Sequence, residues 1–166
     1  MTLESLTLRP MQATDWGAVK SIYLEGIATG NATFQTSVPS WETWDVSHLT
    51  ACRLVAEHDK AILGWAMLSP LSSRCVYAGV AEVSVYVAKK AQGKGLGFTL
   101  LSQLIGDSEI NGLWTLEAGI FPKNTASLNI HRRCGFREVG LREKLGKLNG
   151  KWRDVMLLER RSPVVL

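Results

Sequence analysis

The segment Gln92-Gly93-Lys94-Gly95-Leu96-Gly97 places three glycines in five residues between two predicted regular elements. The residues before it, 80–87 (VAEVSVYV), predict a strand, and those after it, 95–110, predict a helix with a leucine stripe. Glycines permit positive φ, and the first N–H groups of a helix point outward at the positive end of its dipole. The stretch therefore predicts an anion site suited to a phosphate or pyrophosphate. Three lysines add positive charge nearby: Lys89, Lys90 and Lys94.

The pattern on either side predicts one mixed sheet. Further strands are expected at 3–9, 53–57, 61–69, 113–120, 136–142 and 152–160, and further helices after Thr14, after Ser40 and over 124–133. Asn149-Gly150 is a hairpin turn signal between the last two strands. The order β-α-α-β-β-β-α-β-α-β-β mixes hairpins with strand–helix–strand crossovers. We expect an α/β fold of the α+β mixed-sheet kind, with helices on both faces.

Composition fits a single domain over residues 1–166. The chain is 46% hydrophobic and 20% charged, as in an average folded domain. Its net charge is +4, but residues 131–166 carry 10 basic and 4 acidic groups. A basic end suits a polyanion, either nucleic acid or a phosphorylated small molecule, or it is simply a solvated face. No aromatic-plus-basic RNA-binding pattern is present, so nucleic acid is not the expected partner.

The cysteines indicate a reducing compartment. Cys52, Cys75 and Cys134 are odd in number, widely spaced and without a CxxC pair. This argues against a disulfide framework and against a zinc site, so no metal is expected. No signal-like segment and no run of 18 apolar residues occurs, which makes a cytoplasmic chain without membrane partners the expectation.

The spacing of the glycines restricts which class of phosphate-containing ligand the turn can bind. The P-loop pattern G-x-x-x-x-G-K-[ST] is absent, and the third glycine of a dinucleotide-binding G-x-G-x-x-G is replaced by Phe98. Glu117, near the end of the next strand, stands roughly where a ribose-binding acid is expected. A nucleotide-binding module for NAD or ATP therefore stays open as an alternative.

Two motifs resemble those of the GNAT acetyltransferase superfamily. Gln92-x-x-Gly95-x-Gly97 is similar to its acyl-CoA pyrophosphate loop, and Asn124, His131 and Gly135-Phe136 are similar to the helix beside the CoA thiol. The predicted strand order is also that of the superfamily, so the resemblance spans essentially the whole chain. It implies acetyl-CoA as co-substrate. The cofactor-binding residues it implies are Val85, Tyr86, Val87, Gln92, Gly93, Lys94, Gly95, Leu96, Gly97, Phe98 and Asn124.

Four further stretches resemble the phosphinothricin N-acetyltransferases: 28–34 (ATGNATF), 74–77 (RCVY), 82–87 (EVSVYV) and 150–155 (GKWRDV). This resemblance implies acetylation of the α-amine of a small amino acid analogue, such as phosphinothricin, methionine sulfoximine or methionine sulfone. It also implies a homodimer. Gln35 and the pair Cys75-Val76 depart from the usual residues of this group, which affects the expected substrate more than the reaction.

Glu82 is the candidate general base that takes the proton of the amine. It lies in an otherwise apolar strand, where burial would raise its pKa toward the working range. From the pattern alone, a solvent-facing or arginine-paired carboxylate is equally compatible. The resemblance implies that an N–H near Val87 stabilises the thioester oxygen, after the strand parts from its neighbour to receive the pantetheine. His131 stands where many members carry the tyrosine that protonates the thiolate, so it is either that acid or a structural histidine.

Arg74 is the candidate partner of the acceptor carboxylate, through a bidentate pair. Phe34 covers the acceptor side chain or plugs its own loop, and three more substrate contacts are expected at Cys75, Val76 and Tyr77. The alternatives to a small-molecule acetyltransferase are a protein N-terminal acetyltransferase and a non-catalytic acyl-CoA-binding domain. Nucleic-acid binding through the basic end ranks last.

Overall fold

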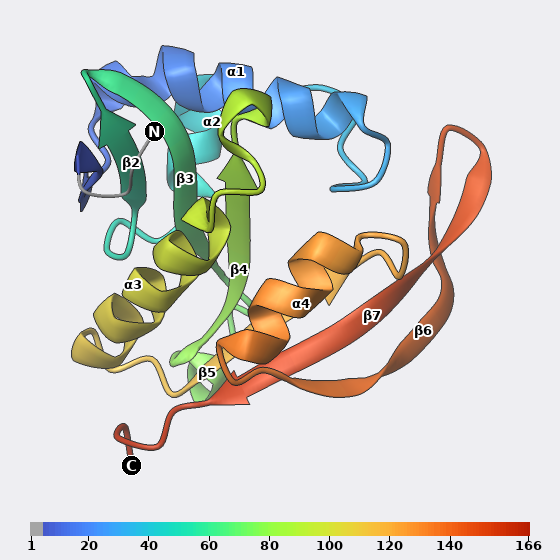
Figure 1. Ribbon diagram of the computed structural model, residues 1–166. Coiled ribbons are helices and arrows are strands. Elements are labelled where there is room, and N and C mark those ends of the chain that lie inside the picture. Colours follow the sequence, from blue (N-terminus) through green and yellow to red (C-terminus); the bar gives the residue numbers. More distant parts are fainter. Residues whose placement is uncertain (1–4) are drawn as a thin grey trace.

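A computed structural model describes residues 5–166 and contains one seven-stranded sheet in the order β1-β2-β3-β4-β5-β7-β6 (Figure 1). β4 and β5 are parallel, and the other neighbouring pairs are antiparallel. The predicted mixed sheet of about seven strands is confirmed. The strands are β1 (Thr7–Pro10), β2 (Leu54–His58), β3 (Ala61–Pro70), β4 (Val80–Val87), β5 (Thr115–Ile120), β6 (Arg137–Leu148) and β7 (Lys151–Arg161). Part of the first expected strand, 3–9, lies outside the described residues.

Two of the helices, α2 and α4, begin at short polar side chains that cap them, whereas α1 and α3 have no side-chain cap. Ser40 Oγ accepts from Thr43 N before α2, and Asn124 Oδ1 accepts from Ser127 N before α4. The helices are α1 (Trp16–Ala28), α2 (Trp41–Val46), α3 (Leu96–Ile110) and α4 (Thr125–Arg133), with short 3-10 turns η2 (Ala13–Asp15), η3 (Cys75–Tyr77) and η4 (Lys89–Ala91). Over residues 5–166, no helix has the length and apolar character needed to cross a membrane.

Helices cover both faces of the sheet, as predicted (Figure 1). Side chains alternate along β3, so Trp65 and Met67 pack under α1 and α2, whereas Ala66 and Leu68 pack under α3 and α4. The core under α1 and α2 includes the buried side chains of Trp44 and Trp65. The partly buried Trp16 and Trp41 pack against it. The second core is aliphatic and includes the buried leucines of α3. Because side chains alternate between the two faces of β3, one sheet packs against helices on both sides.

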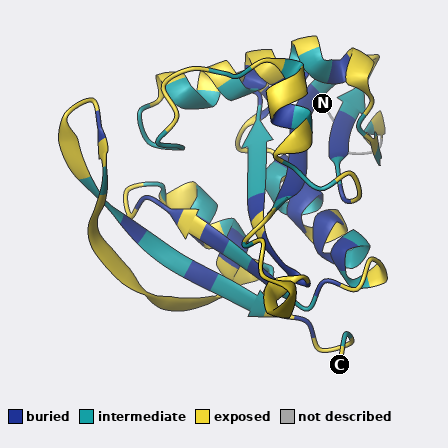
Figure 2. Cartoon of the chain, turned by 180° about the vertical axis from the view of Figure 1, so that it is seen from behind, coloured by how far each residue is buried: buried dark blue, intermediate teal, exposed yellow. Residues whose placement is uncertain are grey.

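The β6–β7 hairpin extends from the body of the molecule, and β6 is exposed along nearly its whole length (Figure 2). Asn149 and Gly150 form its turn with φ of +50° and +78°, which confirms the predicted turn. The hairpin is longer than the expected 136–142 and 152–160. Lys144 adopts a φ of +47° at an irregularity in β6, where Asp154 Oδ1 accepts from Lys144 N at 2.7 Å. This bulge breaks the alternation that identifies a strand in sequence.

Gly79 precedes β4 in a place where no side chain fits. A Cβ there would lie 2.0 Å from Cε3 of Trp114. We expect Gly79→Ala to lower the free energy of unfolding by about 1–3 kcal/mol through overpacking, as measured by urea denaturation. Gly17→Ala in α1 is the control, because a Cβ there meets no atom within 4 Å, and it should be neutral or stabilising. Equal stability of the two variants would contradict this account.

Candidate active site

β4 and β5 part in the middle of the sheet. Their parallel register runs over three pairs, Val80–Thr115, Ala81–Leu116 and Glu82–Glu117, and then stops. Beyond this point β4 stays paired with β3, and β5 stays paired with β7. No strand among residues 5–166 therefore pairs with the β5-facing edge of 83–87. Such an edge offers main-chain groups to an extended ligand lying along it.

The glycine turn lies between the end of β4 and the start of α3. Gly93 and Gly95 have φ of +74° and +82°, the left-handed region that favours glycine, and a Cβ on either would project into open space. Gln92 Nε2 donates to Val87 O at 3.2 Å and ties the turn to β4. In the described part of the chain, no acceptor meets the N–H groups of the first helical residues, Leu96, Gly97 and Phe98. The predicted anion cradle is therefore present in geometry.

The side chains of the cradle point in different directions. Leu96 is buried in the core, and a Cβ on Gly97 would lie 3.2 Å from Ile130 Cδ1, so glycine lets α3 approach α4. Phe98 lies beneath the guanidinium of Arg133, 4.3 Å from the ring centroid. Lys94 Nζ donates to Lys90 O at 3.3 Å, and both lysines are exposed beside the turn. The electrostatics of the turn thus favour a polyanion.

The three expected contact residues of β4 divide between the two faces. Val85 and Val87 pack against the α3 and α4 core. Tyr86 turns to the other face, where its ring stacks on Trp65 at 4.6 Å between centroids and meets Tyr23 edge-on at 5.0 Å. Burial raises the pKa of Tyr86, so the phenol stays neutral. These residues therefore offer a ligand mainly their main-chain groups.

Glu82 lies at the point where β4 and β5 part. Glu82 as a residue is exposed, because the alternation of β4 directs it away from the aliphatic core, so the predicted burial holds for its carboxyl group and not for the whole side chain. Protein atoms still crowd the carboxyl, and this loss of water raises the pKa of Glu82, with the charge of Glu117 acting in the same direction and Arg142 opposing it. The raised pKa agrees in direction with the prediction and comes partly from a neighbouring charge.

His131 is buried in α4, and Asn124 caps that helix. His131 Nδ1 lies 2.8 Å from Ser127 O, so it donates there, and Nε2 has no partner among the described residues. Burial lowers the pKa of His131, which leaves it neutral at pH 7 with a free lone pair on Nε2. The Asn124 oxygen is used by the helix N-terminus.

Phe34 packs in a small apolar cluster under the β6–β7 hairpin. It meets Phe121 edge-on at 4.9 Å, and Leu148 and Val155 complete the cluster. Arg153 fixes the same loop: Nη1 donates to Gly30 O at 2.7 Å and Nη2 donates to Asn31 Oδ1 at 3.1 Å. Arg153 was not among the predicted site residues, although it lies in the stretch 150–155 that resembles the phosphinothricin N-acetyltransferases. The hairpin and the loop after α1 are thereby joined.

The segment Arg74–Tyr77 is exposed on the surface before β4. Arg74 lies over the ring of Tyr77 at 5.4 Å, and Cys75 and Val76 lie in the η3 turn. No acidic partner holds the Arg74 guanidinium within the described residues. The guanidinium therefore remains able to pair with a carboxylate.

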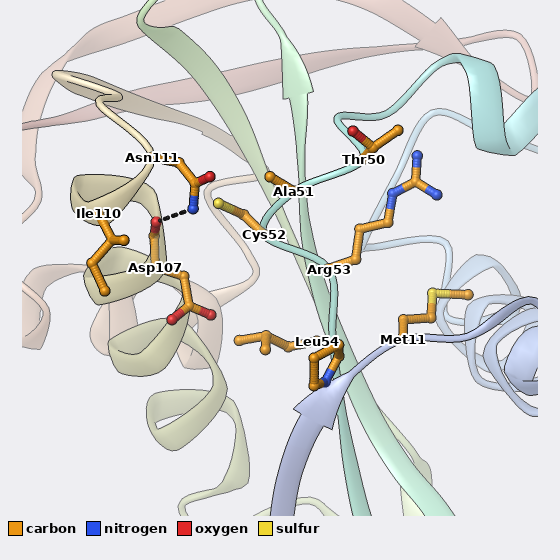
Figure 3. Close-up of a pocket in the computed structure, with 10 residues that line it drawn as sticks. Met11, Thr50, Ala51, Cys52, Arg53, Leu54, Asp107, Ile110 and Asn111 are labelled. Atoms are coloured by element: carbon orange, nitrogen blue, oxygen red, sulfur yellow. Dashed lines mark hydrogen bonds between the residues drawn. The ribbon is translucent and has the colours of Figure 1, made fainter.

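A separate surface pocket of about 290 Å³ lies between the start of β2 and the end of α3 (Figure 3). Cys52, Asp107 and Asn111 border it, and Asn111 Nδ2 donates to Asp107 O at 2.8 Å. None of the residues expected in the site lines this pocket. The open edge of β4, the glycine turn and Glu82 lie along one strand and its C-terminal end, and they form the candidate active site.

Comparison with known proteins identifies the family of the chain. The sequence model of the Acetyltransferase (GNAT) family matches residues 13–136, which include β4, the glycine turn and α4. The chain belongs to the GNAT acetyltransferase family. It is therefore an acyltransferase enzyme, and the predicted fold of this family is confirmed.

Two relatives of this GNAT enzyme span most of it. The phosphinothricin N-acetyltransferase of Alcaligenes faecalis is 35% identical over 165 residues, covering 93% of this chain and 81% of that protein. The L-methionine sulfoximine/L-methionine sulfone acetyltransferase of Pseudomonas aeruginosa is 28% identical over 161 residues, covering 93% and 94%.

Two solved structures share the fold of this GNAT enzyme closely. A phosphinothricin acetyltransferase from Sinorhizobium meliloti in complex with AcCoA has a TM-score of 0.85 and 31% identity, covering 95% of this chain and 88% of that one. A ribosomal-protein-alanine N-acetyltransferase from Brucella melitensis has a TM-score of 0.86 and 29% identity, covering 94% and 99%.

Proposed function

We propose that this GNAT enzyme transfers the acetyl group of acetyl-CoA to the α-amine of a small amino acid analogue of the phosphinothricin, methionine sulfoximine or methionine sulfone type. The observation that carries the proposal is the open edge of β4, with Glu82 at its inner end and the glycine cradle at its outer end. The functions in the names of the relatives from Alcaligenes faecalis and Pseudomonas aeruginosa support the substrate class.

Acetyl-CoA fits the residues present. The unpaired N–H groups at the start of α3 suit the pyrophosphate, and Lys89, Lys90 and Lys94 add positive charge around it. The pantetheine arm then lies along the unpaired edge of 83–87, which directs the thioester toward Glu82. The neighbour from Sinorhizobium meliloti, whose structure is a complex with AcCoA, supports this ligand.

In the proposed reaction the Glu82 carboxylate takes a proton from the ammonium group, directly or through a water. The freed nitrogen lone pair attacks the thioester carbonyl, and the oxygen gains negative charge beside main-chain N–H groups on the open edge of β4. The C–S bond then breaks, and the new amide nitrogen loses its second proton while the CoA thiolate gains one.

His131 is not assigned as the acid in this proposal. A proton donor must be protonated, whereas burial keeps His131 neutral and its Nδ1 proton is bound to Ser127 O. The thiolate instead takes the proton released by the amide nitrogen, through water or within the collapsing intermediate. Arg74 pairs with the acceptor carboxylate, and Phe34 closes the loop over the acceptor end of the site.

The test is a thiol-release assay with acetyl-CoA. The acceptors are phosphinothricin, methionine sulfoximine, methionine sulfone and the ordinary amino acids. We expect release with one or more of the three analogues, and the N-acetylated product in mass spectra. Acetyl-CoA binding without turnover on any acceptor would instead indicate a non-catalytic acyl-CoA-binding domain. Preferential binding of NAD or ATP would indicate a nucleotide module.

A protein N-terminal acetyltransferase is the second candidate. The structural neighbour from Brucella melitensis, a ribosomal-protein-alanine N-acetyltransferase, favours it. Against it stands the loop after α1, which Arg153 and the Phe34 cluster fasten to the β6–β7 hairpin at the acceptor end. Peptides with N-terminal alanine belong in the same assay, and faster release with them than with the free analogues would reverse the ranking.

We also propose that the enzyme forms a homodimer. The exposed face and edge of the β6–β7 hairpin carry Val139, Leu141, Leu145 and Trp152, each more than 40% exposed. Exposed apolar side chains beside an unpaired strand edge favour association with another chain. Sedimentation equilibrium should give twice the 18.3 kDa chain mass, and a single-chain mass at micromolar concentration would contradict the proposal.

A further inference from the structure

Three glutamates stand side by side on one face of the sheet. Strand register places Glu117 of β5 opposite Glu82 of β4, and Glu159 of β7 opposite Glu117. Paired residues on neighbouring strands point to the same face, with backbones about 5 Å apart. Ser69 of β3 continues the row beyond Glu82, and Arg137 of β6 ends it in an ion pair with Glu159.

Glu117 occupies a special place in this row. The Glu82–Glu117 pair is the last one before β4 and β5 part, so Glu117 is the charged neighbour of Glu82 at the inner end of the open edge. On the other side of Glu82, β3 contributes the uncharged Ser69. In a dinucleotide-binding protein Glu117 would bind a ribose, but this chain belongs to the GNAT family.

The charged groups that act on Glu82 come from β5 and β6. Glu117 opposes ionisation of Glu82, Arg142 of β6 favours it, and Tyr86 on β4 itself is a neutral phenol. Glu117 is in turn raised in pKa, first by loss of water and then by Glu159, with Arg142 again opposing. The ion pair to Arg137 compensates much of the charge of Glu159, and the strand register makes Glu117 the anion next to Glu82.

We propose that Glu117 is a positioning residue for the acetyl transfer, whose carboxylate makes Glu82 hold its proton to higher pH and so makes Glu82 a stronger base. The inference rests on the proposed function, in which Glu82 takes the proton of the amine. A stronger base removes a proton from an ammonium group more readily, provided that it is ionised at the working pH. The charge of Glu117 makes Glu82 hold its proton to higher pH, because like charges on adjacent strands disfavour the state in which both carboxyls are ionised.

The test follows the Glu82 carboxyl itself. The protein is labelled with ¹³C at glutamate carboxyls, and the Glu82 resonance is assigned by its loss in Glu82→Gln. In Glu117→Gln the titration midpoint of Glu82 should move to lower pH, and in Arg142→Gln it should move to higher pH. Glu138→Gln is the control, because Glu138 pairs with Arg132 and its register partner Leu158 lies on the other face. It removes the same charge and should leave the midpoint unchanged.

Kinetics on the same variants test the link to the reaction. With an analogue that the wild type acetylates, the ratio of kcat/KM at pH 6 to that at pH 8 should rise about two- to threefold in Glu117→Gln and fall in Arg142→Gln. A midpoint unmoved by Glu117→Gln would overturn the inference. A midpoint that moves while the kinetic profile stays fixed would instead remove Glu82 from the mechanism, so failure of the inference and failure of the proposed function are distinct results.

Discussion

Glu82→Gln should lower kcat about 10²- to 10⁴-fold, the range expected for loss of a general base. The amide is nearly the same shape as the carboxylate but accepts no proton from an ammonium group. Because the pKa of Glu82 is raised, the wild-type rate should fall as the pH drops through that pKa, and this acid limb should vanish in the variant. The measurement is kcat against pH with a saturating acceptor.

Acetyl-CoA affinity separates loss of the base from loss of the site. Calorimetry should give Glu82→Gln an affinity close to that of the wild type, because the cradle and the β4 edge remain. Glu143→Gln on the β6 strand, away from the register row of Glu82, controls for the removal of one negative charge. Unchanged turnover of Glu82→Gln across the pH range would rule out the proposed base.

Gly95→Val should reduce acetyl-CoA affinity at least about 100-fold, with a corresponding loss of kcat/KM. Gly95 is the N-cap residue of α3, and a Cβ there meets no atom within 4 Å, so we expect the valine side chain to compete with the pyrophosphate for this space. Loss of several charge-assisted hydrogen bonds accounts for an effect of this size. Isothermal titration with acetyl-CoA measures it directly.

Backbone strain is the competing cause, since Gly95 has a φ of +82°. Gly112→Val is the matched control: Gly112 follows the other end of α3, has a φ of +76°, and a Cβ there also meets open space. Both variants should lose similar stability in thermal melts, but only Gly95→Val should lose acetyl-CoA binding. Equal affinities in the two variants would contradict the cradle assignment.

Local signals in the sequence predicted the elements around the site well. Glycines with positive φ, the Ser40 and Asn124 caps and the Asn149-Gly150 turn depend on neighbouring residues alone, so pattern and structure agree there. The length of the β6–β7 hairpin was not predictable, because the bulge at Lys144 depends on Asp154 from the other strand.

Side-chain environments depend on contacts distant in sequence and were harder to predict. Glu82 appears buried when its strand is read alone, whereas its exposure and its charged neighbour follow from the pairing of β4 with β5. The role of Arg153 in holding the loop at Gly30 was not predictable, because the two residues are 123 positions apart in the sequence. The neutral state of His131 likewise follows from the enclosure of α4 by the sheet.

The stacking of Trp65 on Tyr86 gives the chain an intrinsic optical reporter. Tyr86 belongs to the parted segment of β4, so a molecule settling along that edge should perturb the indole emission without any attached dye. Stopped-flow fluorescence of the wild type would then time ligand arrival in an unlabelled enzyme, with the change in emission on mixing as the signal.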